Sequence, residues 1–263
     1  VLMRFRRGLV FLLFAATVQA ASPAAAQQPT TPLEVELEAP DEVRDVLERH
    51  VRLLRSDAAV LPEAAADRTA LARRARREIA QLLGTEGYFS PRIRIDRSVP
   101  GRWVLKVEPG PRTTVGAVSI VFEGEVTSAE EEGGQAYLEL LRARWQLTTG
   151  KPFRQADWDA AKQDLLDAIS AQRYAAARIV ASRAEIDPDK ASARLSITVD
   201  SGPAFYLGEL QVSGLQELPA DLVQRYSQLK VGEPYDREKL LAFQTGLQNT
   251  PHFASVIVDI DRD

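Results

Sequence analysis

The chain has 263 residues, 45% of them hydrophobic and 27% charged, a composition that fits one to three globular cores and excludes a wholly disordered protein. Its formal net charge of −4 argues against nucleic acid as a partner, because nucleic-acid-binding proteins usually carry an excess of basic residues. The sequence has no cysteine, so disulfides, thiol nucleophiles and thiolate metal sites are excluded together.

The N-terminus has the three parts of a secretory signal peptide. The basic stretch Met3–Gly8 precedes the apolar run Leu9–Val18, which is shorter than the roughly 20 residues that span a bilayer. Small residues follow this run, as a cleavage site requires. We therefore expect a signal peptide over residues 1–26, a Pro/Thr linker over 27–32 and export of the chain. An uncleaved N-terminal anchor is the alternative.

A strand and two helices are predicted next. Residues Leu33–Ala39 alternate in polarity, which predicts a strand. A helix is then predicted from an apolar stripe at helical spacing, formed by Val43, Val46, Leu47, His50, Val51 and Leu54. Because His50 lies on this stripe, we expect its imidazole to be packed rather than to bind a metal. The second helix is predicted over Ala66–Leu83.

An aromatic residue and two strands complete this first unit. Tyr88 directly follows the second helix, where a large ring can fill the gap between a helix end and a sheet. A strand over Arg92–Asp96 and the turn residues Pro100-Gly101 come next. The closing strand is predicted from its alternating inward residues Trp103, Leu105 and Val107.

The same order of elements returns in a second unit. A strand is predicted over Val115–Gly124, and two helical regions follow, separated by the phrase Gly-x-Pro-aromatic at Gly150–Phe153. Asp157 is predicted as the N-cap of the second helix, whose apolar face consists of Trp158, Ala161, Leu165 and Ile169. After the aromatic residue Tyr174, two strands are expected, and the inward residues of the closing one are Leu195, Ile197 and Val199.

A third unit begins in the same way. A strand is predicted over Leu207–Leu215, and the phrase Gly-x-Pro-aromatic recurs at Gly232–Tyr235. Asp236 is predicted as a helix N-cap, and Phe253 is the aromatic residue before the next strand, Ser255–Ile260. The printed sequence ends before a closing strand, so we expect it to be part of a longer protein. A complete protein ending at residue 263 is the alternative.

A second repeated phrase joins one unit to the next. Residues 107–121 read VEPGPRTTVGAVSIV and residues 199–213 read VDSGPAFYLGELQVS. The two phrases align without a gap, and a repeat of this kind indicates stacked copies of one unit. Proline fixes φ and glycine tolerates a turn, so we expect inter-unit hinges at Gly110, Pro111, Gly202 and Pro203.

The unit of strand, helix, helix, strand and strand, with these two phrases, resembles the polypeptide-transport-associated (POTRA) domain. The resemblance covers residues 33–263 and implies an α+β fold of tandem units, each a small mixed sheet with two helices on one face. The implied boundaries are 33–109, 110–201 and 202–263, the last lacking its closing strand. Three such units behind a signal peptide resemble the periplasmic region of the TamA family, outer-membrane subunits of the translocation and assembly module in the BamA-type superfamily.

The resemblance implies a function in outer-membrane protein assembly and translocation. It implies unfolded outer-membrane protein clients, a TamB-like partner anchored in the inner membrane, and attachment to the outer membrane through a barrel that this sequence does not include. The chain would then lie on the periplasmic side of the outer membrane of a Gram-negative cell. The alternatives are a soluble periplasmic POTRA scaffold, or the POTRA arm of another BamA-type or two-partner secretion transporter.

Two kinds of binding surface are expected. The resemblance implies that the second strand of each unit is an exposed edge that pairs with client segments; these candidate residues are Arg92, Ile93, Arg94, Ile95, Arg178, Ile179, Val180, Val256, Ile257 and Val258. Capping of these edges by charge or by a neighbouring unit is the alternative. A basic run on the second helix of the first unit, Arg73, Arg74, Arg76 and Arg77, is either a solvated face or a docking patch for an acidic partner or for phospholipid headgroups.

No catalytic, cofactor-binding or metal-binding residues are predicted. The two histidines, His50 and His252, lie in different units. The phrase Thr148–Pro152 fails as a phosphate-binding loop, because Trp145 stands where the first glycine is needed and Pro152 where Ser or Thr is needed. We therefore expect a protein that acts through its surfaces and is not an enzyme.

Overall fold

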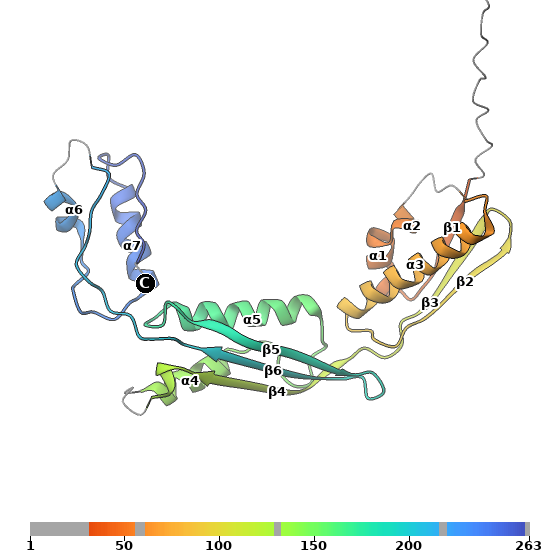
Figure 1. The fold of residues 1–263 in the computed structure, drawn as a ribbon, viewed down its shortest axis with the longest axis horizontal. Coiled ribbons are helices and arrows are strands. Elements are labelled where there is room, and N and C mark those ends of the chain that lie inside the picture. The colour runs from red at the N-terminus through yellow and green to blue at the C-terminus, as the bar shows by residue number, and fades with distance from the viewer. Residues whose placement is uncertain (1–31, 56–60, 129–132, 216–219, 261–263) are drawn as a thin grey trace, which may run out of the picture.

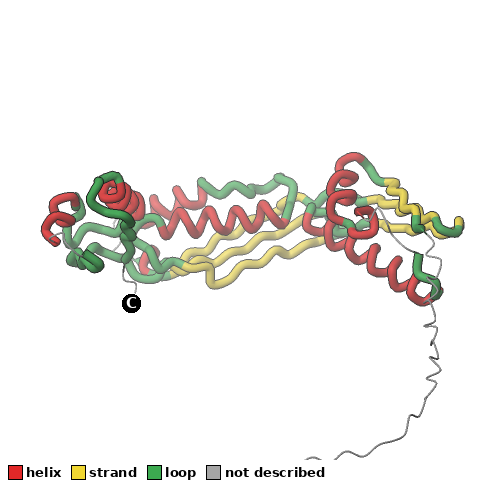
Figure 2. The backbone as a smooth tube through the Cα atoms, turned by 90° about the horizontal axis from the view of Figure 1, so that it is seen from above, coloured by secondary structure: helices red, strands yellow, loops and turns green. Residues whose placement is uncertain are grey.

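Three units lie in a row along the chain in the computed structural model (Figures 1 and 2). The structure describes residues 32–55, 61–128, 133–215 and 220–260. The expected signal peptide and residues 27–31 of the expected linker lie outside the described residues. Among the helices that are described, none is both long and apolar enough to cross a membrane. The fold is α+β, and each unit has hydrophobic clusters of its own.

The first unit is a three-stranded mixed sheet with helices packed against it. Its elements are β1 (Glu34–Glu38), α1 (Asp41–His50), α2 (Arg52–Arg55), α3 (Ala65–Thr85), β2 (Arg92–Val99) and β3 (Arg102–Glu108). The strand order is β1-β3-β2, with β1 parallel and β2 antiparallel to β3. The strand that closes the unit in sequence is therefore the central strand of the sheet.

The core of this unit confirms the inward faces that the sequence predicts. Trp103, Leu105 and Val107 of β3 are buried against Leu47 of α1 and Ile79 of α3. Burial of each large apolar side chain contributes about 2 kcal/mol. His50, in contrast, is exposed, so the expectation of a packed imidazole is wrong. It is the last residue of α1, where the helix ends and the stripe is continued by Val51.

The second unit repeats this plan. Its elements are β4 (Thr114–Glu123), the 3₁₀ turn η1 (Glu125–Thr127), α4 (Gly134–Ala143), α5 (Gln155–Ser170), β5 (Arg178–Asp187) and β6 (Ser192–Asp200). The order β4-β6-β5 again places the closing strand in the centre, parallel to β4 and antiparallel to β5. The inward residues Leu195, Ile197 and Val199 are buried against α4 and α5.

The start of α5 corrects one prediction. Asp157 is not the N-cap: that position belongs to Arg154, and Asp157 lies inside the first helical turn. Arg154 directly follows Phe153, as Asp236 directly follows Tyr235 in the third unit. Its side chain makes no capping hydrogen bond but pairs with Glu86 of the first unit. The cap position is thus used for contact between units.

The third unit has helices but no strand among its described residues. Its helices are α6 (Ala220–Tyr226) and α7 (Arg237–Gln248), and Asp236 caps α7 as predicted by accepting from the amides of Glu238 and Lys239. The predicted strands Leu207–Leu215 and Ser255–Ile260 are not formed. In the other two units the corresponding strands pair with the central closing strand, and no third strand lies between these two segments in the part of the chain described.

Candidate partner-binding surfaces

The outer strand β5 presents one backbone edge that no described strand pairs with. It bonds only to β6, which lies between β5 and β4. The ladder is regular from Ala181 to Asp187 but shifts register between Ile179 and Ala181, so that Val180 is an inserted bulge residue with 46% of its surface exposed. Bulges bend an edge strand and hinder further pairing at that point. The regular open edge therefore begins at Ala181, later in the strand than the sequence predicts.

Several charged side chains along β5 form ion pairs with residues of the same sheet. Arg178 donates to Asp200 at 2.5 Å, and Arg183 and Arg194 both lie within ion-pairing distance of Glu185. These pairs are exposed, so each contributes at most about 1 kcal/mol. They leave the backbone of the edge unprotected.

The outer strand β2 of the first unit is placed in the same way. Ile93 is half-buried and Ile95 buried on the helix side, whereas Arg92 and Arg94 are exposed. Arg92 lies 4.0 Å from Glu108 on the neighbouring strand. The register is irregular between Asp96 and Val99, so the regular edge of β2 is its first half, the part that the sequence predicts.

The third predicted edge does not exist as a strand among the described residues. Ile257 is 87% exposed, and the segment is held by side-chain bonds from α7 instead of a ladder. The Gln248 side chain donates to the carbonyl oxygen of Val256 at 3.0 Å, and the amide of Val258 donates to the Gln244 side chain at 2.9 Å. The expectation of a strand edge at Val256, Ile257 and Val258 is therefore wrong for this structure.

The four arginines of α3 share its solvent face. Arg73, Arg74, Arg76 and Arg77 are all exposed, while Ala72, Ala75, Ile79 and Leu83 bury the opposite side of the helix. The structure thus confirms that the basic run and the apolar stripe lie on different faces. Whether a partner binds there stays a prediction.

The two repeated phrases meet at the joints between units. At the first joint the amide of Thr113 donates to the carbonyl of Gly87, and the amide of Phe153 donates to the carbonyl of Thr113, at 2.9 and 2.8 Å. At the second joint the same two bonds run from Phe205 to Arg173 and from Tyr235 to Phe205, at 2.7 and 2.9 Å. The linking phrase therefore pairs with the Gly-x-Pro-aromatic phrase, which explains why both recur.

A sequence comparison assigns the second unit. Residues 118–202 match the family model described as "POTRA: Surface antigen variable number repeat". Residues 118–202 are thus similar to a POTRA domain, and we call the second unit the POTRA domain. This segment contains most of β4, both helices α4 and α5, and the strands β5 and β6, so the open β5 edge belongs to the POTRA domain. Among curated proteins, no sequence matches this chain.

Solved structures that resemble this chain include parts of BamA and Omp85 proteins and CdiB. BamA POTRA domains 3–5 of Haemophilus influenzae share 14% identity, with 88% of this chain and 90% of that chain covered and a TM-score of 0.47. The N-terminal domain of Omp85 from Thermosynechococcus elongatus shares 13% identity, covering 84% and 86%, at 0.36. CdiB from Escherichia coli shares 11% identity, covering 69% of this chain and 29% of its own length, at 0.31.

The expected hinge residues frame the POTRA domain. Gly110 and Gly202 both have positive φ, 78° and 64°, which favours glycine. A Cβ on Gly110 would lie 3.0 Å from the carbonyl oxygen of Ser90, and Pro111 and Pro203 follow the two glycines directly. These positions set the path of the chain between units. Motion at them stays a prediction.

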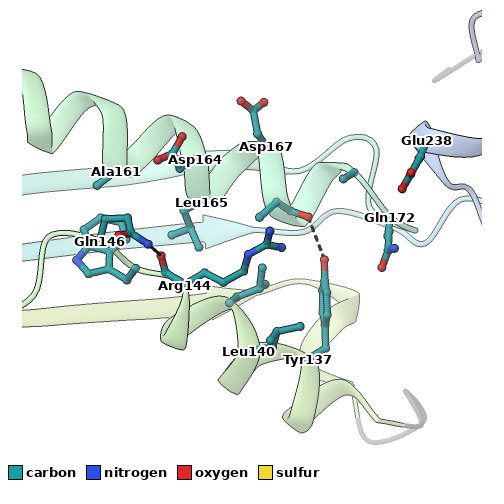
Figure 3. Close-up of a pocket in the computed structure, with 14 residues that line it drawn as sticks. Tyr137, Leu140, Arg144, Gln146, Ala161, Asp164, Leu165, Asp167, Gln172 and Glu238 are labelled. Carbon is teal, nitrogen blue, oxygen red and sulfur yellow. Dashed lines mark hydrogen bonds between the residues drawn. The ribbon is translucent and has the colours of Figure 1, made fainter. Parts of the chain in front are cut away.

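The POTRA domain also has a groove between α4 and α5, which was not predicted from the sequence (Figure 3). Its volume is about 660 Å³, and Glu238 of α7 lies at one end. The Tyr137 hydroxyl donates to the carbonyl of Ala168 at 3.2 Å, and burial raises the pKa of this hydroxyl. The small side chains of Ala161 and Ala168 on α5, and of Ala171 directly after it, line this groove.

The described part of the chain offers no cluster of three or more His, Asp or Glu side chains that could hold a metal ion. Its surface features are two open strand edges, a basic helix face and a groove. All of these are suited to binding polypeptide segments.

Proposed function

We propose that this chain is the periplasmic receptor and scaffold arm of an outer-membrane protein assembly and translocation factor of the TamA type. The observation that carries the proposal is the open edge of β5 within the POTRA domain, regular from Ala181 to Asp187. An extended client segment can add to such an edge as a further strand. Backbone hydrogen bonds then supply affinity with little demand on sequence, which suits a receptor of many unfolded clients.

The side chains beside this edge would discriminate only weakly between client sequences. Ala184 and Ile186 are half-buried on the inner face of β5, and Ser182 is exposed beside them. Alternate residues of an added strand would lie over these positions. Small side chains leave room for varied residues, so the edge would accept segments of many sequences.

The partners follow from the same proposal. Unfolded outer-membrane proteins are the clients, the outer membrane is the location, and a TamB-like protein anchored in the inner membrane contacts the first unit. A soluble periplasmic scaffold, and the arm of another BamA-type or two-partner secretion transporter, are the alternative assignments. The β5 edge would serve strand pairing in each of them.

Photo-crosslinking tests the edge directly. Benzoylphenylalanine placed at Ser182 on the outer strand is expected to crosslink an unfolded outer-membrane porin diluted from urea. The control is Ser196, which is also exposed but lies on the central strand β6, whose backbone is paired on both sides. Equal crosslinking at both positions, or none at Ser182, would contradict strand addition at this edge.

A further inference from the structure

The solvent face of α3 concentrates positive charge that the described part of the chain does not neutralise. Arg73, Arg74, Arg76 and Arg77 are exposed, and none of them forms an ion pair or a side-chain hydrogen bond with a described residue. Elsewhere cationic side chains are commonly paired: Arg44 with Asp41, Lys162 with Asp159 and Lys190 with Asp187. The four arginines are therefore available to a partner.

The two carboxylates of α3 form no ion pair with these arginines. The helix has only two acidic residues, Asp67 and Glu78. At 3.6 residues per turn, both lie more than about 100° around the axis from Arg73, whereas Glu78 lies about 40° and Asp67 about 20° from Arg74. The carboxylate of Glu78 is also occupied, since it accepts from the backbone amide of Arg52 at 3.1 Å. Arg73, Arg76 and Arg77 have no acidic residue three or four positions away, where an exposed helix that used its arginines only for solubility would normally place one.

The neighbours of the arginines distinguish a polypeptide partner from a lipid surface. The positions beside them are small or polar, such as Ala70, Ala80 and Gln81, and α3 carries no exposed large apolar side chain. Helices that lie on membranes insert Trp, Phe or Leu side chains, which this face does not offer. Arginine guanidinium groups pair with carboxylates as well as with phosphates, so it is the lack of apolar anchors on this face that favours an acidic polypeptide over a lipid surface.

The spacing of the face indicates how such a segment would lie. Arg73 and Arg77 are one turn apart, which is about 6 Å along the axis. Alternate side chains of an extended chain on one side are about 7 Å apart. We propose that the solvent face of α3, formed by Arg73, Arg74, Arg76 and Arg77, binds an acidic segment of a partner polypeptide with carboxylates on alternate residues. This proposal does not rest on strand addition at β5.

A labelled peptide of sixteen alternating Glu and Ser residues is the probe, and its binding to the full chain is measured by fluorescence anisotropy at 50 and 300 mM salt. We expect binding that weakens at higher salt, because salt screens exposed charges. The same peptide with Gln in place of Glu is expected not to bind. Binding of both peptides with equal affinity would overturn the proposal.

Two charge-reversal variants locate the site. Arg73→Glu with Arg77→Glu is expected to weaken binding by about tenfold or more, since two attractions become repulsions. The matched control, Lys151→Glu with Lys230→Glu, changes the net charge equally at exposed sites in the other two units and is expected to change affinity less than about twofold. Equal weakening by both variants would overturn the proposal.

Two further measurements close the test. The neutral variant Arg73→Gln with Arg77→Gln is expected to show an intermediate loss, and unchanged circular dichroism verifies that each variant folds. Vesicles containing phosphatidylglycerol are expected not to displace the peptide. Displacement that requires Arg73 and Arg77 would assign the face to lipid and overturn the polypeptide assignment.

Discussion

Gly87 contributes to the first joint in two ways. Its carbonyl oxygen accepts a hydrogen bond from the amide of Thr113, and its lack of a side chain leaves room for the backbone of Phe153. Its φ is 94°, and a Cβ there would lie 2.2 Å from the carbonyl oxygen of Phe153. Phe153 is in turn buried in the core of the POTRA domain and lies 6.0 Å, ring to ring, from Phe89 of the first unit. A side chain at position 87 would thus push against the core of the next unit.

We expect Gly87→Ala to destabilise the protein more than Gly150→Ala does. Gly150 has a similar φ of 87° but open space around its Cβ position, so its replacement costs only the backbone term, about 1 kcal/mol. The clash at Gly87 adds to that term, for a total of about 3 kcal/mol. Thermal unfolding followed by circular dichroism checks this order. Equal shifts of the melting temperature in the two variants would show that the joint accommodates a methyl group at position 87 without additional loss of stability.

Asp236 and Arg154 occupy corresponding N-cap positions, of α7 and α5, but their side chains make different contacts. Asp236 accepts from the amides of Glu238 and Lys239 at 2.9 and 3.3 Å, whereas Arg154 donates to both oxygens of Glu86 at 2.9 and 3.2 Å. Glu86 raises the pKa of the Arg154 guanidinium through this hydrogen bond and its charge. The sequence predicted a cap at Asp236 from local pattern alone. The long-range pair of Arg154 and Glu86 had no local signal.

We expect Asp236→Ala to loosen the start of α7, since loss of an N-cap costs about 1 kcal/mol. Asp236→Asn keeps an oxygen that can accept the same hydrogen bonds and is expected to have a much smaller effect. Hydrogen exchange of the amides of Arg237–Lys239 measures the opening. If both variants exchange alike, the side-chain oxygen is not what holds this turn.

Asp187 gives the β5–β6 turn a dependence on pH. The amide of Lys190 donates to its carboxylate, and this bond, together with the Lys190 side chain, lowers the pKa of Asp187 below its ordinary value of 3.8. The stabilisation is therefore complete above that value and is lost as the pH falls through the lowered pKa. Asp187→Asn is expected to reduce the fall in melting temperature that occurs between neutral pH and pH 3. An unchanged profile would exclude this carboxylate as a contributor.

At the scale of elements, local signals predicted the order of helices and strands and the inward residues of β3 and β6. Apolar periodicity of 3.6 and 2 is readable from neighbouring residues. The sheet order is not, because the closing strand joins partners far apart in sequence: Leu105 of β3 pairs with Leu37 and also with Ile95. The bulge at Val180 and the unformed strands of the third unit depend on such long-range pairing, and the α4–α5 groove depends on the packing of two helices.

A grafted closing strand tests this account of the third unit. A copy of residues 99–108, which hold the turn and β3, is added after Asp263. The graft is expected to pair with residues 207–213 and 255–260 and to protect their amides from hydrogen exchange, because it supplies a strand that can form a ladder with each of them. In the control graft the copies of Trp103, Leu105 and Val107 are serine. Equal protection by both grafts, or none by either, would contradict the role of the central strand.

At the scale of the whole molecule, the two joints between consecutive units are built from the same backbone hydrogen bonds. One further backbone hydrogen bond is found at both joints. The amide of Val115 donates to the carbonyl of Lys151 at the first joint, and the amide of Leu207 donates to the carbonyl of Glu233 at the second, each at 2.8 Å. Each joint therefore ties the linking phrase to the loop before the second helix of the next unit. Backbone bonds of this kind fix orientation with little dependence on side chains, whereas the ion pair of Arg154 and Glu86 adds to the first joint alone.

We expect the first joint to hold one orientation, set mainly by its backbone contacts. The chain has no cysteine, so spin labels at Thr69→Cys on α3 and Ser196→Cys on β6 report a single inter-unit distance. A narrow distance distribution is expected for the otherwise unchanged chain. Glu86→Ala should broaden it slightly, because the backbone bonds remain, and Gly87→Ala should shift or broaden it strongly, because the Phe153 carbonyl must move.

A label pair inside the POTRA domain, Gln163→Cys with Ser196→Cys, controls for loss of the fold and should keep its distance in both variants. A broad inter-unit distribution before any substitution would contradict a fixed joint and favour motion at Gly110 and Pro111. A strong effect of Glu86→Ala equal to that of Gly87→Ala would assign the orientation to the ion pair instead. The chain that keeps Glu86 would then lose its inter-unit order at high salt, which screens an ion pair but leaves backbone hydrogen bonds intact.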